Sequence, residues 1–326
     1  MKLIKLETLN QCLIVLFFVM FIPSFAKPKP DKPVPPTPSK LVKAPQEDPD
    51  AIEINTDLVV VHASVQNDKK AFISGLEKEN FQVFEDGILQ QIDTFHHEDV
   101  SVTVGLVVDN SGSMRTRRTE VIAAGLAFAR SSNPRDQIFV VNFNERVSFG
   151  LPPDTPFTDN VVKLETALSK NVTNGMTALY DGLAVAFEHL KKGNREKQVL
   201  IAISDGGDNA STHTLAHILA LAGKSEVIIY TISIYDESDK DRNAKVLKEL
   251  ARATGGEAFL AKSVKEALPI CERIARDIRN QYSLTYAPTN LKYDGTYRAI
   301  QVKVNVPGNE HLSVRTRAGY SAPLKP

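Results

Sequence analysis

The middle of the chain alternates between two hydrophobic patterns. Short, nearly continuous runs of β-branched and other apolar residues are typical of strands buried on both faces. Longer stretches with the apolar spacing of a helix follow them. This alternation predicts an α/β domain with a doubly wound, mostly parallel sheet. The predicted strands are 102–108, 137–143, 198–204, 226–233 and 257–260. The predicted helices are 115–131, 177–192, 212–223, 241–254 and 263–281.

The segments on either side of this domain have a period of two instead. Within 51–99, every second residue from Val59 to Val65 faces one predicted buried side, and two apolar runs meet at Asp86-Gly87, a strong hairpin signal. Residues 282–326 alternate in the same way. We expect the two segments to pair into one small β-sandwich-like domain into which the α/β domain, 100–281, is inserted. Two separate small β domains are the alternative.

The first 26 residues have the layout of a secretory signal peptide. Two lysines precede an uninterrupted apolar run from Cys12 to Ile22, and small residues end the segment at Ala26. The run is short for a spanning helix, so we expect cleavage, with an uncleaved anchor as the alternative. Residues 27–50 are rich in proline, which predicts a semi-rigid linker. We therefore expect an exported protein without a membrane span after cleavage, in the periplasm, at the cell surface or outside the cell.

The composition is that of a folded protein and argues against some partners. The chain has 326 residues, of which 42% are hydrophobic and 24% charged. Lysine plus arginine and aspartate plus glutamate both number 39, so neither nucleic acid nor an anionic membrane surface is expected as the main partner. Cys271 is the only cysteine left after signal cleavage. It cannot form an internal disulfide, and we expect it to be a buried residue of a helix.

Oxygen-bearing residues gather where predicted strands end. In an open parallel sheet, ligands bind beyond the carboxyl ends of the strands, where loops converge. In chain order, the first polar loop follows strand 102–108, the second opens the helix at 177–192, and the third follows strand 198–204. Together the loops supply two carboxylates and three hydroxyls, from Asp109, Ser111, Ser113, Thr177 and Asp205.

This set of atoms suits a hard divalent cation. Such ions prefer oxygen ligands, and magnesium takes few carboxylates and keeps bound water. Two aspartates roughly neutralise the charge of one ion, and three hydroxyls add neutral oxygens. Gly112 allows the first loop to turn tightly. We therefore expect one Mg²⁺, with Ca²⁺ and Mn²⁺ as alternatives, and room for an anionic oxygen from another molecule.

The same residues resemble a known family. Asp109-x-Ser111-x-Ser113, followed by Thr177 and Asp205, is similar to the metal-ion-dependent adhesion site of von Willebrand factor type A domains. The resemblance extends from 102 to about 281 and has all five positions in order. It implies that the three hydroxyls contact the metal and that the aspartates bind it directly or through water. The flanking segments 75–87 and 317–320 resemble secreted bacterial proteins with a type A-related domain.

Each element of this set also has an ordinary structural explanation. Aspartate and serine favour turns, and Thr177 alone would be read as a helix N-cap. The metal prediction depends on their joint occurrence at successive strand ends. Asp208 lies outside the predicted ligand set, and we expect it to shape its loop.

Other polar clusters are weaker candidates. His96 and His97 are neighbours in a predicted strand and so point to opposite faces. His213 and His217 have the i, i+4 spacing that can hold zinc, but the glutamate of a metalloprotease helix is absent. We expect a solvated connector at the first pair and a structural or surface role for the second. A solvated helix start, able also to attract an acidic partner, is expected of Arg115, Arg117 and Arg118.

These observations favour a non-catalytic binding module over an enzyme. The expected function is metal-dependent adhesion, in which the bound ion takes a carboxylate from a protein partner. The first alternative is a structural or assembly scaffold of the cell envelope. The second, a metal-assisted hydrolase, needs a general base or nucleophile near the ion, and the strand-end loops offer no obvious histidine, spare glutamate or Gly-x-Ser-x-Gly elbow.

Overall fold

The computed structural model describes residues 58–97, 99–234, 242–308 and 311–324. The predicted signal peptide, 1–26, and the predicted linker, 27–50, lie outside the described residues, as do the first residues of the N-terminal β segment. Residues 54–326 form one compact unit.

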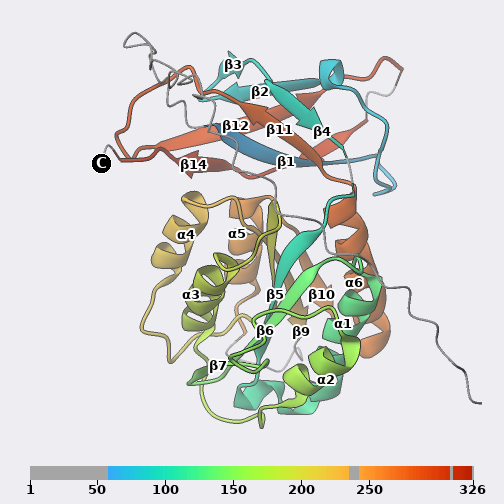
Figure 1. Cartoon of the computed structure of the whole chain (residues 1–326), viewed down its shortest axis with the longest axis vertical. Coiled ribbons are helices and arrows are strands. Elements are labelled where there is room, and N and C mark those ends of the chain that lie inside the picture. The colour runs from blue at the N-terminus through green and yellow to red at the C-terminus, as the bar shows by residue number, and fades with distance from the viewer. Residues whose placement is uncertain (1–57, 98, 235–241, 309–310, 325–326) are drawn as a thin grey trace, which may run out of the picture. The chain divides into compact units, whose positions relative to one another are not determined.

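A mostly parallel sheet lies at the centre of the α/β part (Figure 1). Its strand order is β10-β9-β8-β5-β6-β7, and only β7 runs antiparallel to its neighbour. All eight residues of β5 are buried, as expected of a central strand covered on both faces. The bounds are β5 (Val102–Asp109), β6 (Gln137–Phe143), β7 (Val147–Phe149), β8 (Lys197–Ser204), β9 (Ile228–Ile234) and β10 (Ala258–Ala261).

Helices cover both faces of this sheet. In Figure 1, α3, α4 and α5 lie on one face and α1, α2 and α6 on the other. The predicted doubly wound α/β class is therefore confirmed. The bounds are η2 (Gly112–Arg117), α1 (Arg118–Ser131), α2 (Val161–Ser169), α3 (Leu179–Leu190), α4 (Leu215–Gly223), α5 (Ala244–Thr254) and α6 (Val264–Arg279).

Strands from before and after the α/β part form two four-stranded antiparallel sheets. Their orders are β13-β1-β11-β4 and β14-β12-β2-β3. Apolar side chains from β1, β2, β11 and β12 share one core, so the two sheets form a β-sandwich that flanks the α/β part. The bounds are β1 (Val59–Gln66), η1 (Lys78–Asn80), β2 (Phe81–Glu85), β3 (Ile88–Gln90), β4 (Thr94–His96), β11 (Tyr282–Tyr286), β12 (Tyr297–Val304), β13 (Ser313–Arg315) and β14 (Gly319–Ser321).

The hairpin predicted at Asp86-Gly87 is shorter than the sequence suggests. Strand β3 pairs with β2 across the turn, but the apolar run continues into β4, which pairs with β11 in the other sheet. Asp86 and Gly87 have positive φ angles of 48° and 81°, as a tight hairpin turn requires. Neither β7 nor α2 was among the predicted elements.

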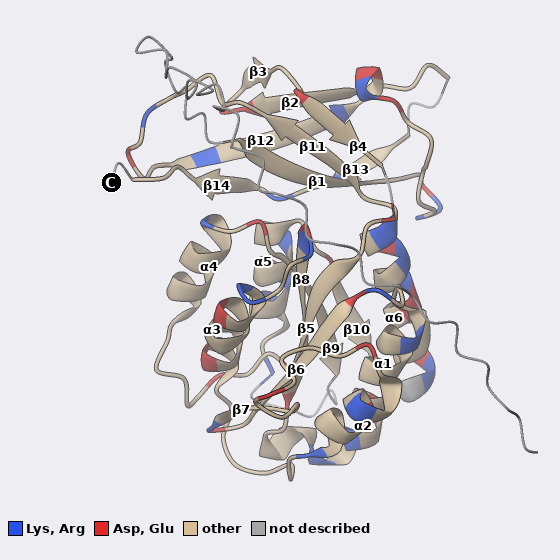
Figure 2. Cartoon of the chain, viewed as in Figure 1, with Lys and Arg blue, Asp and Glu red and all other residues tan. Residues whose placement is uncertain are grey.

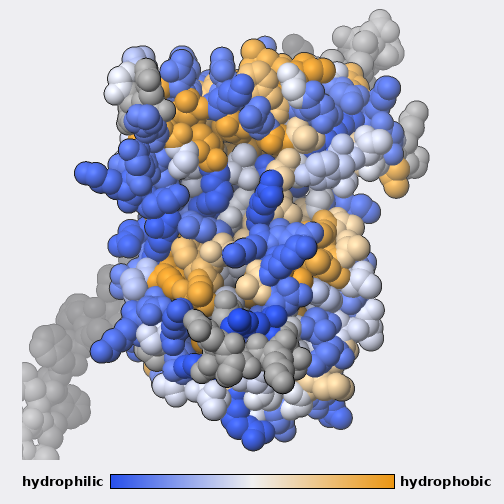
Figure 3. Space-filling model, turned by 180° about the vertical axis from the view of Figure 1, so that it is seen from behind, coloured by the Kyte–Doolittle hydropathy of each residue, from blue (hydrophilic) through white to orange (hydrophobic). Residues whose placement is uncertain are grey.

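Charged and apolar side chains are mixed over the surface. Acidic and basic residues are interspersed on both parts in Figure 2, in keeping with the equal numbers of the two signs. Hydrophobic areas on the opposite face, shown in Figure 3, lie over the β-sandwich and over the α/β part. None of the described helices is long and apolar enough to cross a membrane.

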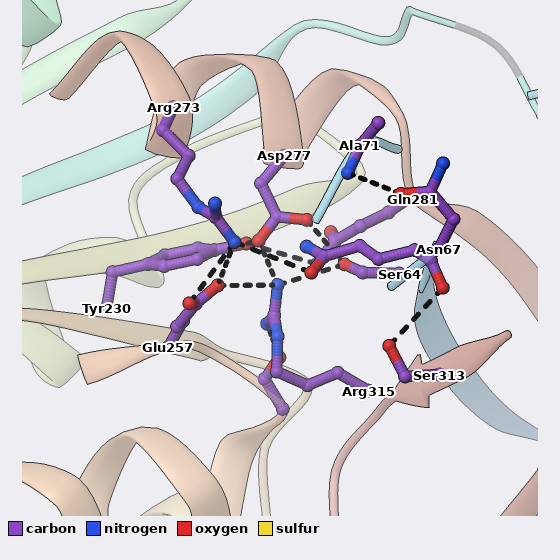
Figure 4. A network of polar contacts seen from close by, with 12 residues as sticks. Ser64, Asn67, Ala71, Tyr230, Glu257, Arg273, Asp277, Gln281, Ser313 and Arg315 are labelled. Carbon is purple, nitrogen blue, oxygen red and sulfur yellow. Dashed lines mark hydrogen bonds and ion pairs between the residues drawn. The ribbon is translucent and has the colours of Figure 1, made fainter. Parts of the chain in front are cut away.

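The C-terminal helix of the α/β part is anchored to the β-sandwich through Asp277. This side chain is only 1% exposed and lies on α6. Its carboxylate accepts hydrogen bonds from Ser64 Oγ at 2.5 Å and Tyr230 Oη at 2.8 Å, and it pairs with Arg315 (Figure 4). The partners come from β1, β9 and β13, so this one carboxylate connects the central sheet, through β9, to one sheet of the β-sandwich, through β1 and β13. Glu257, 3.3 Å from Arg273 and 3.7 Å from Arg315, extends the network.

Candidate metal centre

Asp109 ends the central strand β5 and is fully buried. Its Oδ1 accepts a hydrogen bond from the Ser111 backbone N–H at 2.8 Å, the geometry of an Asx turn. Its Oδ2 accepts a hydrogen bond from Ser204 Oγ at 2.6 Å, at the end of the neighbouring strand β8. The turn residues and the sheet register therefore fix this carboxylate in one orientation.

The first and third loops meet through serine hydroxyls. Ser113 Oγ donates to Asp205 Oδ2 at 2.5 Å and lies 3.1 Å from Ser111 Oγ. Asp205 is 1% exposed, and its Oδ1 accepts a hydrogen bond from the Gly207 backbone N–H. Gly206 beside it has a φ of 87°, and a Cβ there would lie 2.5 Å from Asn243 O. Only glycine can make this turn without strain.

Backbone hydrogen bonds connect the loop of Thr177 to both of the others. Gly112 N donates to Gly175 O at 3.0 Å, and this joins it to the first loop. The N–H groups of Asn209 and Ala210 both donate to Thr177 O, at 2.9 and 3.0 Å, and this joins it to the third loop. The Asn209 side chain in turn accepts from Thr177 N at 2.8 Å. Thr177 is thus placed by its neighbours' backbones, and it is 6% exposed.

The structure therefore brings the loops of all five predicted residues together. Four of the five side chains are connected by hydrogen bonds through the serines, and Thr177 is connected through its backbone. Ser113 is exposed, whereas the other four are buried, so the cluster opens to solvent on the side of Ser113. This arrangement leaves oxygen atoms of two acids and two serines within one small volume.

The two buried carboxylates, Asp109 and Asp205, repel each other electrostatically. The pKa of Asp109 is raised to about 7. Burial of the carboxylate is the main cause, and the negative charge of Asp205 is the second. Hydrogen bonds from Ser111 and Ser204 act in the opposite direction without outweighing them. A cation placed between these acids would relieve both the burial cost and the repulsion.

The donor set suits a hard cation and differs from a transition-metal cluster. Among the described residues, no group of three or more His, Cys, Asp or Glu side chains could hold a metal ion. The candidate centre has only two carboxylates and depends on hydroxyl oxygens for further ligands. Magnesium accepts such a site, because it binds few carboxylates and completes its coordination shell with water.

A family comparison agrees with this reading of the fold. The family model of the von Willebrand factor type A domain matches residues 104–207. This stretch runs from β5 to the loop after β8 and contains all five candidate ligands. The chain contains a von Willebrand factor type A domain. None of the curated protein sequences compared with the chain matches it.

Solved structures with the same kind of fold are distant from this chain. A von Willebrand factor type A protein from Catenulispora acidiphila has 14% identity and a TM-score of 0.49, over 82% of this chain and 75% of that one. The conserved hypothetical protein BatB from Bacteroides thetaiotaomicron has 15% identity and a TM-score of 0.41, over 55% and 98%. The von Willebrand factor domain of the type V pilus tip protein Mfa5 from Porphyromonas gingivalis has 15% and 0.44, over 55% and 97%. Likenesses at this level say nothing about what the type A domain here binds.

Arg118 holds the first loop of the type A domain through hydrogen bonds of its side chain. Its guanidinium donates to Asn110 Oδ1, to Leu168 O at 2.5 Å and to Asn171 O at 3.1 Å. The side chain is half-buried, and burial lowers its pKa. The expectation of a solvated residue at this position is therefore wrong. Asn110 also donates to Asn142 Oδ1 at 2.9 Å, which connects the loop to β6.

Sequence reasoning missed Glu145 at the rim of the centre. Its Oε2 accepts a hydrogen bond from the Met176 backbone N–H at 3.1 Å. The carboxylate lies over Gly175, where a Cβ would come within 1.6 Å of it. Glu145 follows β6, the strand beside β5, so the rule of strand ends that identified Asp109 and Asp205 applies to it as well. It adds an exposed negative charge next to the loop of Thr177.

Three other polar residues considered in the sequence, Asp208, Cys271 and His97, have structural roles. Asp208 accepts hydrogen bonds from Tyr180 N at 3.1 Å and Ser211 Oγ at 2.6 Å, so it shapes its loop, as expected. Cys271 is free and buried on α6, as expected. His97 stacks on Tyr282 with ring centroids 4.1 Å apart.

A sizeable cavity lies away from the candidate centre. It has a volume of about 590 Å³ and lies between the end of α4 and the β-sandwich. Exposed apolar side chains at its walls include Leu58, Leu291 and Leu324. None of the five candidate ligands lines this cavity, so the cavity and the candidate metal centre are two separate places on the protein. We place the function at the loops because their chemistry is specific.

Proposed function

We propose that this chain is an exported, non-catalytic binding protein whose type A domain holds one divalent cation, Mg²⁺ first, and grips a carboxylate of a protein partner. The observation that carries the proposal is the convergence of three loops around two buried carboxylates. Export is proposed from the pattern of residues 1–26, and the final compartment is left as periplasm, cell surface or exterior. The residues proposed to hold the ion are Asp109, Ser111, Ser113, Thr177 and Asp205.

The chain's own residues explain why an acidic partner is proposed. Two aspartates neutralise the double charge of one ion, and three hydroxyls add oxygens without further charge. When bound, such an ion supplies an electrophilic position for one incoming anionic oxygen. Ser113 lies on the exposed side of the cluster, which makes that side the approach for the partner. The surrounding loops, which carry the exposed Met176, would determine which partners fit.

The contacts of the serines support a binding role over hydrolysis. A serine nucleophile needs a general base within hydrogen-bond reach. Among the described residues, the hydroxyls of Ser111 and Ser113 contact each other and Asp205, and neither contacts a histidine. Asp205, which accepts the hydrogen bond from Ser113, is itself buried beside Asp109, and an acid in that position is better suited to hold a cation.

Partner capture tests this proposal. The purified protein is immobilised and exposed to envelope and secreted proteins of its own source, with Mg²⁺ and with a chelator in excess. We expect the captured proteins to be lost with the chelator and with the Thr177→Ala variant, which removes one hydroxyl from the centre. Mass spectrometry of the eluates and circular dichroism of each variant are the readouts.

A matched variant separates this effect from a general disturbance. Thr166→Ala removes an exposed hydroxyl of α2 that donates a hydrogen bond within its own helix, to Val162 O, so capture should persist. Capture of the same proteins by wild type with chelator and by Thr177→Ala would contradict metal-dependent adhesion. That outcome would favour the scaffold alternative instead.

A further inference from the structure

A carboxylate–histidine pair lies beside the candidate metal centre. His213 Nδ1 is 2.7 Å from Asp181 Oδ1, and the His213 backbone N–H donates to the same oxygen at 2.9 Å. Asp181 also accepts hydrogen bonds from the backbone and hydroxyl of Thr212, at 3.0 and 3.2 Å. The carboxylate is thus held by two successive residues of the loop before α4, and it holds the imidazole in place.

The contact determines which nitrogen of His213 remains available. Burial raises the pKa of Asp181, but the hydrogen bonds from Thr212 and His213 outweigh it and lower the pKa. An ionised carboxylate only accepts hydrogen bonds, so the proton of a neutral His213 is on Nδ1. Nε2 then keeps its lone pair. The side chain is 40% exposed, so this nitrogen can be reached from solvent.

A second imidazole lies next to it. The ring centroids of His213 and His217 are 4.7 Å apart, with 32° between the ring planes. The His217 side chain is exposed, and its ring packs against that of His213. Because the His217 side chain is exposed, it can rotate so that one of its nitrogens and Nε2 of His213 face the same ion. Two neutral imidazoles that close together are a chelating pair.

We propose that His213 and His217 form a second cation site, for a transition-metal ion of the Zn²⁺, Ni²⁺ or Cu²⁺ class, with Asp181 orienting His213. Imidazole nitrogens suit these ions, whereas Mg²⁺ prefers oxygen. A metal-binding histidine characteristically donates its other ring N–H to a carboxylate, which fixes its tautomer and orientation. The Asp181–His213 contact has this arrangement. The pair supplies two ligands, and water or a partner side chain supplies the others.

The position of the pair gives the site a place in recognition. Asp181 is in the first turn of α3, four residues after Thr177, and His213 follows the third loop by a few residues. A partner docked over the candidate metal centre would therefore have this pair close by. The inference stands on its own contacts and goes beyond the proposed function, because it concerns different ligands and a different class of metal.

Zinc titration of the tag-free protein tests the site. We expect one Zn²⁺ per chain by calorimetry. We expect His217→Ala to lower the affinity by more than about 10-fold, and Asp181→Asn, which removes the orienting charge, by about 10-fold. His217 is exposed, so its replacement should leave the fold intact, which circular dichroism checks. His311→Ala removes another exposed histidine, and we expect it to bind Zn²⁺ like wild type.

The same series distinguishes this site from the candidate centre of the type A domain. Asp109→Ala should leave zinc binding unchanged, and His217→Ala should leave magnesium binding unchanged. Equal zinc affinity in wild type and His217→Ala would overturn the inference. So would an equal loss in His311→Ala, or zinc binding that disappears with Asp109→Ala alone.

Discussion

Replacing Asp109 by asparagine is expected to leave the metal-free protein at least as stable as wild type at pH 8, and to remove its stabilisation by Mg²⁺. The reason is that the native carboxylate of Asp109 is fully buried and is repelled by the charge of Asp205. Asparagine is nearly the same size and keeps an acceptor for the Ser111 N–H, but it has no charge to bury. It also lacks the charge needed to hold a divalent ion.

The direction of the pH effect follows from the pKa of Asp109. Burial, followed by the charge of Asp205, raises it from 3.8 to about 7 in the folded protein. A carboxyl group that binds its proton more tightly when folded stabilises the fold at low pH, and this contribution is lost as the pH rises through about 7. The metal-free wild type should therefore lose stability between about pH 4 and 7. Asp109→Asn should not show this part of the loss.

Thermal unfolding with and without Mg²⁺ measures both effects. An ion at about 100 times its dissociation constant stabilises a protein by about 2.7 kcal/mol, so wild type should gain several degrees and Asp109→Asn none. Asp154→Asn removes an exposed acid and should behave like wild type. Equal Mg²⁺ stabilisation of wild type and Asp109→Asn would contradict the assignment of Asp109 as a ligand.

Replacing Asp277 by alanine is expected to lower the free energy of unfolding by about 3 kcal/mol or more. The buried carboxylate of Asp277 accepts hydrogen bonds from Ser64 and Tyr230 and pairs with Arg315. Removing one partner of a buried ion pair leaves the other charge poorly compensated, which costs more than the pair itself contributes. Arg315 would keep only the more distant Glu257, at 3.7 Å, as an acidic neighbour in the network. Here the loss also leaves the Tyr230 hydroxyl buried without its acceptor.

Urea denaturation followed by circular dichroism measures this change. Glu272→Ala, on the exposed side of the same helix, is the control and should change stability by less than about 0.5 kcal/mol. Because Asp277 connects α6 to β1 and β13, the variant should also loosen the attachment of the type A domain to the β-sandwich. A loss below about 1 kcal/mol for Asp277→Ala would show that the network does not hold the two parts together.

Periodicity in the sequence predicts most of the fold because burial differs so clearly between elements. The run 137–143 has the same bounds as β6, and the run 198–204 ends at the same residue as β8. The pattern cannot show which sheet an alternating strand joins, since either sheet of a sandwich buries one face. The run after Asp86-Gly87 therefore looks like one hairpin strand, whereas the chain crosses to the other sheet at β4. Short β7 and α2 have too few apolar positions to stand out.

The part of the candidate site that depends on strand ends and residue types could be predicted from the sequence. Asp109 and Asp205 follow apolar runs whose carboxyl ends share one edge of a parallel sheet, and the serines and Thr177 lie in loops at that edge. Arg118 could not be placed, because its burial depends on the carbonyl groups of Leu168 and Asn171 from a helix region that the pattern does not reveal. Glu145 was missed because the loop after β6 was not read for acids, although the same rule applies there.

Calorimetric titration of Mg²⁺, Ca²⁺ and Mn²⁺ into the purified protein, beside Asp109→Ala, tests the central claim most directly. Each titration is repeated with acetate as a carboxylate that completes the coordination of a weakly bound ion. We expect wild type to bind one divalent ion per chain, most favourably Mg²⁺, and Asp109→Ala to bind none while remaining folded by circular dichroism. Absence of binding by wild type even with acetate, or equal binding by Asp109→Ala, would contradict the claim that these loops form a metal-dependent binding site.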